Sequence, residues 1–297
     1  MASLEYAAIF NNTLRELYGQ VLTCSDLFSS NEDIQIVNGK EIKIPKLSVS
    51  GYKDHTRGGN YNSGTYQNEY ETKVLDHDRD VEFIIDPVDV DETNLTVAIA
   101  NIQKRFENTQ AIPELDCYTF SKLYAEAERV SALIKTEALT TANVLSDLDD
   151  NLEKMSDAGV PLDRVILFAT PAYKRLLKEA EGIQRTLEAT GNGSIDRRVR
   201  TVDDIQKIIE VPSSRFKTLY NFTNGCVADG SAKQIDYILI DPEAQVSRVK
   251  YSYIKLFTPG SDSRTADNYL YQNRRLNGTF GIDELLKQGI IVHTAAE

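Results

Sequence analysis

The sequence predicts an α+β fold, on three observations. Short apolar runs typical of buried strands, such as residues 164–169 and 234–240, alternate with amphipathic segments at helical spacing. A strand pattern at residues 81–86 leads directly into a long helical pattern at residues 91–127. The helices and strands show no regular alternation of the kind that builds a parallel sheet. With 297 residues, the chain can bury a substantial core and has room for two domains.

The N-terminal part of the chain is mostly polar and extended. A weak helical stripe in residues 3–22 predicts a short helix that would be marginal alone, so it either docks outside its own segment or frays. Residues 34–49 have apolar side chains at every second position, and Asn38-Gly39 is a hairpin signal. The strand pattern resumes at residues 72–88.

Residues 51–70 lie between these strands and contain four glycines, four tyrosines and no aliphatic residue. Such a segment cannot bury itself against its own domain, so one interpretation is a flexible loop. The other is a projection that docks on a neighbouring chain, because tyrosines among Gly, Asn and Ser supply contact area at low entropic cost. We favour the second and predict these contact residues: Tyr52, Lys53, Arg57, Tyr61, Tyr66 and Tyr70.

The long helical pattern follows the strand in which Val81, Phe83 and Ile85 share one face. Asp91 suits the helix start, because its side chain can cap and its charge complements the dipole. Pro113 then predicts a bend or two helices in line. The predicted core stripe of the first half is Leu95, Ile99, Ile102 and Phe106, and that of the second half is Leu115, Phe120, Leu123 and Ala127.

The rest of the chain reads as an ordinary compact domain. Its one ambiguous stretch, around Ile205, Ile208 and Ile209, fits either a helix or a strand. The other expected elements are a helix at 143–158, a buried strand at 164–169, a helix opened by Thr170-Pro171, a turn at 191–193, a buried strand at 234–240, a strand at 246–257, and a helical turn with a last strand at 281–294.

Composition argues against several functions. The 45 acidic and 33 basic residues give a formal charge of −12 and a pI near 4.9, which disfavours a DNA-binding module. Cys24, Cys117 and Cys226 are far apart in sequence and form no CxxC, so we expect reduced thiols in a cytoplasmic setting. The chain shows no membrane-spanning run and no signal peptide.

The sequence also shows no catalytic apparatus. His55, His77 and His293 are scattered without metal spacing, and the glycines at 191 and 193 read as a turn and not as a nucleotide fingerprint. No GxSxG elbow is present. We therefore predict no enzyme, no catalytic residue, no metal and no cofactor.

The order of these elements resembles the major capsid protein of tailed bacteriophages, the Hong Kong 97-like fold. The shared features are an arm, a polar loop between strands, a strand entering a long helix with an IPELD break, and a compact α+β domain. The closing segment, residues 249–293, adds an aromatic-rich strand, a Pro-Gly turn, Arg274-Arg275 and a terminal Gly-Ile-Ile-Val-His.

The resemblance implies a division of the chain. It implies an N-terminal arm (1–33), strands with an extended loop (34–90, the loop at about 50–75), a spine helix and peripheral domain (91–141), an axial domain (142–251) and a return to the peripheral domain (252–297). It further implies that Arg274 and Arg275 make contacts between subunits in the peripheral domain.

The resemblance also implies partners. Subunits of this fold form pentamers and hexamers that close into an icosahedral head around a portal, enclosing double-stranded DNA without binding it specifically. The protein would be assembled in the host cytoplasm and reside in the virion. Met1 begins at the arm, so we expect a separate scaffolding protein. Some relatives cross-link a loop lysine, but Lys53 has no recognisable asparagine or glutamate partner, so no cross-link is predicted.

Two alternatives remain open. An encapsulin-type nanocompartment shell shares the fold, although the four-tyrosine loop ahead of the spine helix favours the phage protein. A soluble α+β enzyme or binding domain would need a constellation of His, Cys or paired carboxylates that the sequence does not display. An enzyme is expected to purify as a small closed oligomer, and a shell protein as rings or particles.

Overall fold

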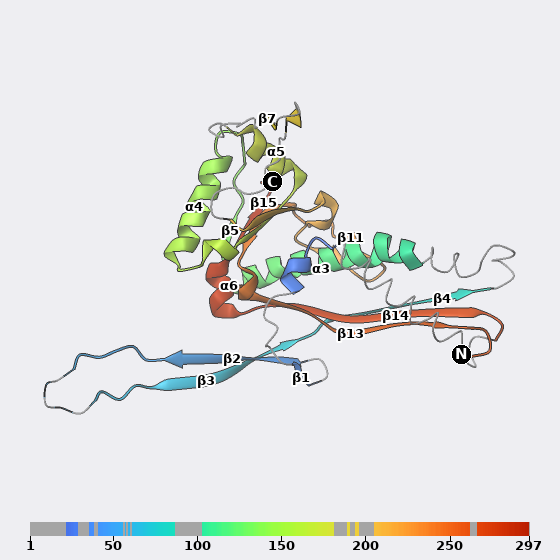
Figure 1. The fold of residues 1–297 in the computed structure, drawn as a ribbon, viewed down its shortest axis with the longest axis horizontal. Helices are drawn as coiled ribbons and strands as arrows, with labels where there is room; N and C mark the ends of the chain where they lie inside the picture. Colours follow the sequence, from blue (N-terminus) through green and yellow to red (C-terminus); the bar gives the residue numbers. More distant parts are fainter. Residues whose placement is uncertain are drawn as a thin grey trace.

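The structure is a computed structural model of the 297-residue chain (Figure 1). The residues it describes are 22–28, 36–38, 41–55, 57, 59, 61–86, 103–180, 189–190, 194–195, 205–261 and 266–296. The predicted helix at residues 3–22 and the first part of the long helix, residues 91–102, therefore lie outside the described residues, apart from Leu22.

A five-stranded mixed sheet forms the centre of the compact domain, in the order β5-β15-β12-β6-β9. Strand β12 pairs antiparallel with both β15 and β6, whereas the outer pairs β15/β5 and β6/β9 are parallel. The bounds of these strands are Leu133–Lys135 (β5), Ile166–Ala169 (β6), Lys207–Glu210 (β9), Ile235–Ile240 (β12) and Ile290–Thr294 (β15). The ambiguous stretch around Ile208 is thus an edge strand, fixed by its pairing with β6.

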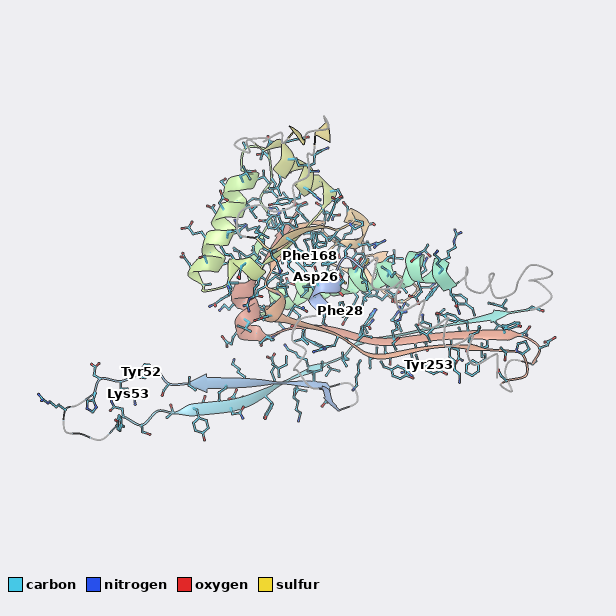
Figure 2. The ribbon with its side chains drawn as sticks, viewed as in Figure 1. Asp26, Phe28, Tyr52, Lys53, Phe168 and Tyr253 are labelled. Carbon is cyan, nitrogen blue, oxygen red and sulfur yellow. The ribbon has the colours of Figure 1, made fainter. Side chains whose placement is uncertain are left out.

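Both faces of this sheet are buried, which explains why β6 and β12 read as continuous apolar runs. Tyr237 and Leu239 point to the face covered by α4 (Val144–Asp157) and α5 (Pro171–Glu179). Ile238 and Ile240 point to the opposite face, which is covered by α3 (Ile112–Arg129), the 3₁₀ turn η1 (Ser25–Phe28) and Phe216, which follows the 3₁₀ turn η4 (Ser213–Arg215). Figure 2 labels Phe168 in this second core.

The helix ends follow the local signals in the sequence. The Thr170 side chain accepts a hydrogen bond from Tyr173 N at the start of α5. Gly159 has a φ of +82° just after α4, where Val160 N donates to Met155 O, as in a Schellman cap. Pro113 stands in the first turn of α3, directly after the π-helical turn η2 (Glu107–Ala111), so the helix continues from residue 103 to Arg129.

A long antiparallel sheet runs beneath α3, in the order β13-β14-β4 (Figure 1). Its strands are Gln245–Phe257, Tyr269–Gly281 and His77–Ile85. The last two elements of the chain, α6 (Asp283–Gly289) and β15, return it to the compact domain.

A second antiparallel sheet, β1-β2-β3, extends away from the body as a hairpin (Figure 1). Strand β1 (Ile36–Asn38) pairs with β2 (Glu41–Val49), as Asn38-Gly39 predicts, and β2 pairs along its whole length with β3 (Tyr66–Val74). The predicted strand start at residue 72 is wrong. Pairing with β2 makes residues 66–71 a strand although they contain no aliphatic side chain, so the connecting loop is residues 50–65.

Short elements complete the described fold. Hairpins β7/β8 (Ala189–Thr190 and Ser194–Ile195) and β10/β11 (Tyr220–Asn221 and Val227–Ala228) carry the domain's outer turns. The turn predicted at residues 191–193 lies outside the described residues. The remaining elements are the 3₁₀ turns η3 (Leu162–Arg164) and η5 (Pro242–Ala244).

Candidate assembly surfaces

The tip of the β2/β3 hairpin presents its aromatic side chains to solvent. Tyr52 and Tyr61 are 109% and 95% exposed, and Tyr66 and Tyr70 are 78% and 63% exposed. Lys53 and Arg57 are also exposed. Figure 2 shows Tyr52 and Lys53 at the end of the hairpin, far from the compact domain. The structure thus brings the six predicted loop residues onto one projecting element.

Local hydrogen bonds give the loop a shape without a hydrophobic core. Ser50 N donates to Thr65 O over 2.9 Å, and Thr65 N donates to Ser50 Oγ over 3.0 Å, which extends the ladder past the strand ends. Asn62 Nδ2 donates to Asp54 O over 2.8 Å, and the His55 and Tyr61 rings lie 6.2 Å apart. A surface this aromatic is suited to contact with another protein.

The hairpin is buried only at its root. Ile42 and Ile44 pack with Leu75, Leu276 and Phe280, whereas Leu47 and Val49, further along the same strand, are 66% and 73% exposed. Gly278 makes this packing possible, because a Cβ there would lie 2.2 Å from Leu75 Cδ2.

Charged groups also join the root to the body. Lys73 Nζ lies 2.5 Å from Glu71 Oε1 and 3.3 Å from Asp283 Oδ1. Arg129 of α3 pairs with the same Asp283. The Arg129 hydrogen bond, with the charge of Lys73, holds the pKa of Asp283 well below its usual range. Nearer the tip, Lys46 Nζ lies 2.7 Å from Glu284 Oε1.

The two arginines of β14 lie in different environments, because neighbouring residues of a strand point to opposite faces. Arg274 is 53% exposed and binds Asp78 through Nε (3.0 Å) and Nη2 (2.8 Å), with its guanidinium 5.9 Å from the Tyr251 ring centroid. Arg275 is only 11% exposed, and its Nη2 donates to Glu107 Oε1 over 2.7 Å. Arg275 therefore joins β14 to the long helix within one subunit, and Arg274 alone of the two is offered at the surface.

The aromatic-rich strand expected in the closing segment is β13, and its rings form a stripe along the strand. Tyr251 is half-exposed, the Tyr251 and Tyr253 rings stack at 6.4 Å, and Lys255 Nζ lies 4.4 Å from the Phe257 centroid. The Tyr253 label in Figure 2 lies on the outer side of the long sheet. The spacing of these residues at every second position indicates that they share one face of a strand, but it does not indicate which face of the sheet is covered.

Of the predicted first half of the spine-helix core, Phe106 is within the described residues. Its ring lies 5.4 Å from Phe83, which stacks on Tyr271 at 6.1 Å. Leu95, Ile99 and Ile102 lie outside the described residues. The second stripe is confirmed, since Leu115, Phe120, Leu123 and Ala127 are all buried.

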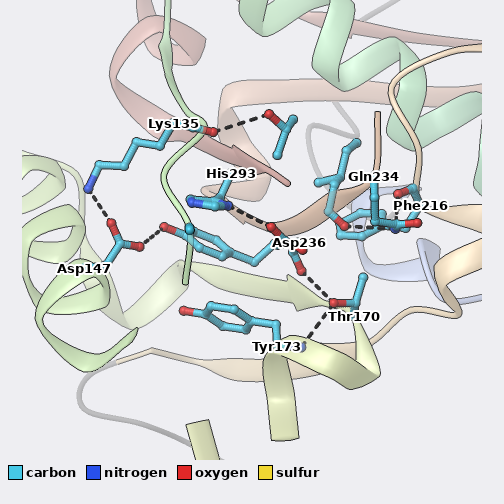
Figure 3. Close-up of polar contacts among 12 residues, drawn as sticks. Lys135, Asp147, Thr170, Tyr173, Phe216, Gln234, Asp236 and His293 are labelled. Carbon is cyan, nitrogen blue, oxygen red and sulfur yellow. Dashed lines mark hydrogen bonds and ion pairs between the residues drawn. The ribbon is translucent and has the colours of Figure 1, made fainter. Parts of the chain in front are cut away.

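A buried polar network lies between α4 and the central sheet (Figure 3). Tyr237 donates its hydroxyl proton to Asp147 Oδ2 and accepts a hydrogen bond from Asn151 Nδ2 over 2.6 Å. Lys135 Nζ binds the other Asp147 oxygen at 2.6 Å. Burial, with the nearby Tyr173 and Asp147, raises the pKa of Tyr237, so its hydroxyl remains a donor. The network is connected internally, which suits a role in fixing the domain.

Three further contacts in Figure 3 bind the start of strand β12 and the residue before it to neighbouring segments. His293 Nδ1 lies 3.0 Å from Asp236 Oδ2, and Thr170 Oγ1 donates to the Asp236 carbonyl over 3.2 Å. Gln234 Nε2 donates to Phe216 O over 2.7 Å. His293 is thus held in the core and is far from the hairpin that carries His55.

In the described part of the chain, no group of His, Cys, Asp and Glu is arranged to hold a metal ion. Within the same residues, no helix is both long and apolar enough to cross a membrane.

No protein-family model and no curated protein matches the chain. Solved structures do. The asymmetric unit of the bacteriophage PhiM1 mature capsid matches with a TM-score of 0.65 and 13% identity, covering 86% of this chain and 82% of that chain. The capsid of the cyanophage P-SCSP1u gives 0.61 and 12% identity, covering 92% and 87%. A virus-like particle from Pyrococcus furiosus gives 0.51 and 11% identity, covering 97% of both chains. The chain therefore has the fold of phage capsid subunits, a fold that the virus-like particle shares.

Proposed function

We propose that this chain is the major capsid protein of a tailed bacteriophage, with a Hong Kong 97-like subunit. The observation that carries the proposal is the match to capsid subunits over 86% and 92% of the chain. Because identity is only 12–13%, the likeness is one of fold, and the function follows from the fold together with the surfaces it presents.

The hairpin tip is the main assembly element in this proposal. A tyrosine-rich loop held away from its own core gains burial only against another molecule. In a shell built from identical subunits, the neighbouring copy is the partner always within reach. Tyr52, Lys53, Arg57, Tyr61, Tyr66 and Tyr70 would make that contact.

The peripheral sheet is the second assembly element. Arg274 and the exposed Tyr251 occupy its outer side, and we propose that this face meets a neighbour. Arg275 stabilises the subunit through Glu107, so its contribution to contact between subunits would be indirect.

The remaining assignments follow the same fold. Residues 1–33 would be the N-terminal arm, 34–90 the extended loop with its strands, 91–141 the spine helix and peripheral domain, 142–251 the axial domain, and 252–297 the return to the peripheral domain. The subunits would form pentamers and hexamers of an icosahedral head, with a scaffolding protein and a portal as partners. The charge of −12 suits a shell that encloses DNA without gripping it.

A second candidate is the shell of a protein compartment of the encapsulin type. The Pyrococcus furiosus virus-like particle favours it, because that match covers 97% of both chains. Its TM-score of 0.51 is lower than the 0.65 and 0.61 of the two phage capsids. The phage capsid is therefore the better supported function.

Electron microscopy of the purified protein tests the proposal. Negative staining, with light scattering after size exclusion, should show rings, tubes or closed shells, alone or after addition of a scaffolding protein. Shells that form without a helper and retain a protein cargo would favour the compartment. A monomer that stays monomeric under all these conditions would reject both candidates.

A further inference from the structure

The β10/β11 hairpin packs on the middle of the spine helix through a cluster of rings. The Phe222 ring lies 5.2 Å from that of His77 and 6.1 Å from that of Tyr118, and the His77 and Tyr118 rings stack at 4.0 Å. This cluster joins the hairpin, α3 and β4 at one point. It fixes the turn that carries Cys226 against the helix that carries Cys117.

The two cysteines, far apart in the sequence, meet at this point. Cys117 is buried and Cys226 is half-buried, and their side chains are hydrogen-bonded to each other. The bond from Cys226 lowers the pKa of Cys117 and raises that of Cys226. Hydrogen-bonded sulfurs need only a small closing movement to reach bonding distance. A thiolate paired with a thiol is the reactive combination in disulfide chemistry.

Two cavities lie where the hairpin packs on the helix, and sequence neighbours of both cysteines line them. One, of about 430 Å³, is lined by Thr223, Asn224 and Gly225 together with Glu114 and Leu115 of the helix. The other, of about 400 Å³, is lined by Tyr220, Phe222, Tyr118 and Ser121. Tyr118, which follows Cys117 in the helix, lines the second cavity, and Gly225, which precedes Cys226 in the hairpin, lines the first.

We propose that Cys117 and Cys226 form a reversible oxidation site that closes an intrasubunit disulfide between the spine helix and the β10/β11 hairpin. The oxidant is a hydroperoxide. The Cys117 thiolate attacks one peroxide oxygen, the O–O bond breaks, and a sulfenic acid and hydroxide form. The Cys226 sulfur then attacks the Cys117 sulfur, the S–O bond breaks, and water leaves with the thiol proton. In sum, two thiols and one hydrogen peroxide give one disulfide and two waters.

The disulfide would constrain the long chain segment between the two cysteines and so stabilise the folded subunit. If the protein is a capsid subunit, as proposed above, it is made in a reducing cytoplasm and released into oxidising surroundings, where such a bond persists. The chemistry itself does not depend on assembly, so it is tested on the unassembled subunit.

The test treats the folded wild-type subunit with hydrogen peroxide, alkylates the remaining thiols after denaturation, and maps tryptic peptides. We expect peptides 106–122 and 218–233, which hold Cys117 and Cys226, to be recovered linked, with the loss of two hydrogens and release by dithiothreitol. The oxidised subunit should unfold at a temperature higher by about 5 °C or more.

Cys24→Ser is the matched control, because Cys24 is buried and its sulfur lies 3.8 Å from Thr119 Oγ1. It should keep both the linked peptide and the thermal shift. Cys226→Ser, in a half-buried turn, should lose both. The proposal is overturned if all wild-type thiols remain alkylatable after peroxide, if Cys226 gains oxygen without a link, or if the link involves Cys24 or a second subunit.

Discussion

Tyrosines in two regions of this molecule differ in their solvent exposure. In the hairpin, Tyr52 and Tyr61 are almost fully exposed, whereas in the compact domain Tyr173 and Tyr237 are buried. The backbone does not cause the difference, since β2/β3 and β6/β12 are both regular antiparallel ladders. Helices cover both faces of the sheet in the compact domain, whereas among the described residues no helix covers the hairpin beyond its root.

This contrast distinguishes the buried contacts that stabilise the subunit from the exposed surface that remains for a partner. The domain buries its apolar groups and binds polar groups such as Asp147 within its own core. Beyond Ile44 the hairpin has no such closure, and Leu47, Val49 and the tyrosines stay at the surface. Buried area drives folding in the first region, and we expect it to drive association in the second.

The largest expected effect comes from removing the hairpin tip. Deleting residues 58–63 should abolish or severely impair assembly and leave the subunit folded, because none of the described residues in this segment belongs to a core. Circular dichroism should be unchanged while electron microscopy shows no closed shells. A variant with the same six positions replaced by Gly and Ser keeps the loop length and tests the side chains alone. Normal shells from the deletion would contradict the docking role of the tip.

Changes in the domain should act on stability instead. Tyr237→Phe removes the hydroxyl that serves both Asp147 and Asn151, so unfolding in urea should require less free energy by about 1–3 kcal/mol. Tyr173→Phe is the matched control. The Tyr173 hydroxyl is buried without a hydrogen-bond partner in the described part of the chain, so its loss should be nearly neutral or slightly stabilising. Equal losses in the two variants would show that the network contributes nothing specific.

The same contrast explains what the sequence could predict. The α4 stripe, the β6 and β12 runs and the cap at Thr170 were readable, because each is a local pattern imposed by one buried face. Strand residues 66–71 were missed, because they are polar and become a strand only by pairing with β2.

Contacts between residues far apart in the sequence could not be predicted from local patterns, for a related reason. Nothing near Arg275 indicates that Glu107 lies beside it, and nothing near Cys117 indicates Cys226. Such contacts depend on how β14 and the β10/β11 hairpin pack on the long helix, which no single stretch of sequence specifies. The sequence indicated which residues the loop would expose, but not which arginine of β14 would face outward.

The smallest expected effect lies at the joint between the two regions. Asp283→Asn removes the charge that Lys73 and Arg129 share, and at neutral pH it should lower unfolding stability by up to about 1 kcal/mol, because the site is partly exposed. The pKa of Asp283 is depressed in the folded state, so its contribution is complete above the unfolded value of 3.8 and declines as pH falls below it. The stability difference between wild type and variant should therefore be constant from pH 7 to pH 5 and narrow below about pH 4. Glu284→Gln, at the exposed pair with Lys46, is the control and should change stability less. A difference that widened in acid would show that Asp283 is not held ionised by the two cations, and that the hairpin root depends on its apolar contacts alone.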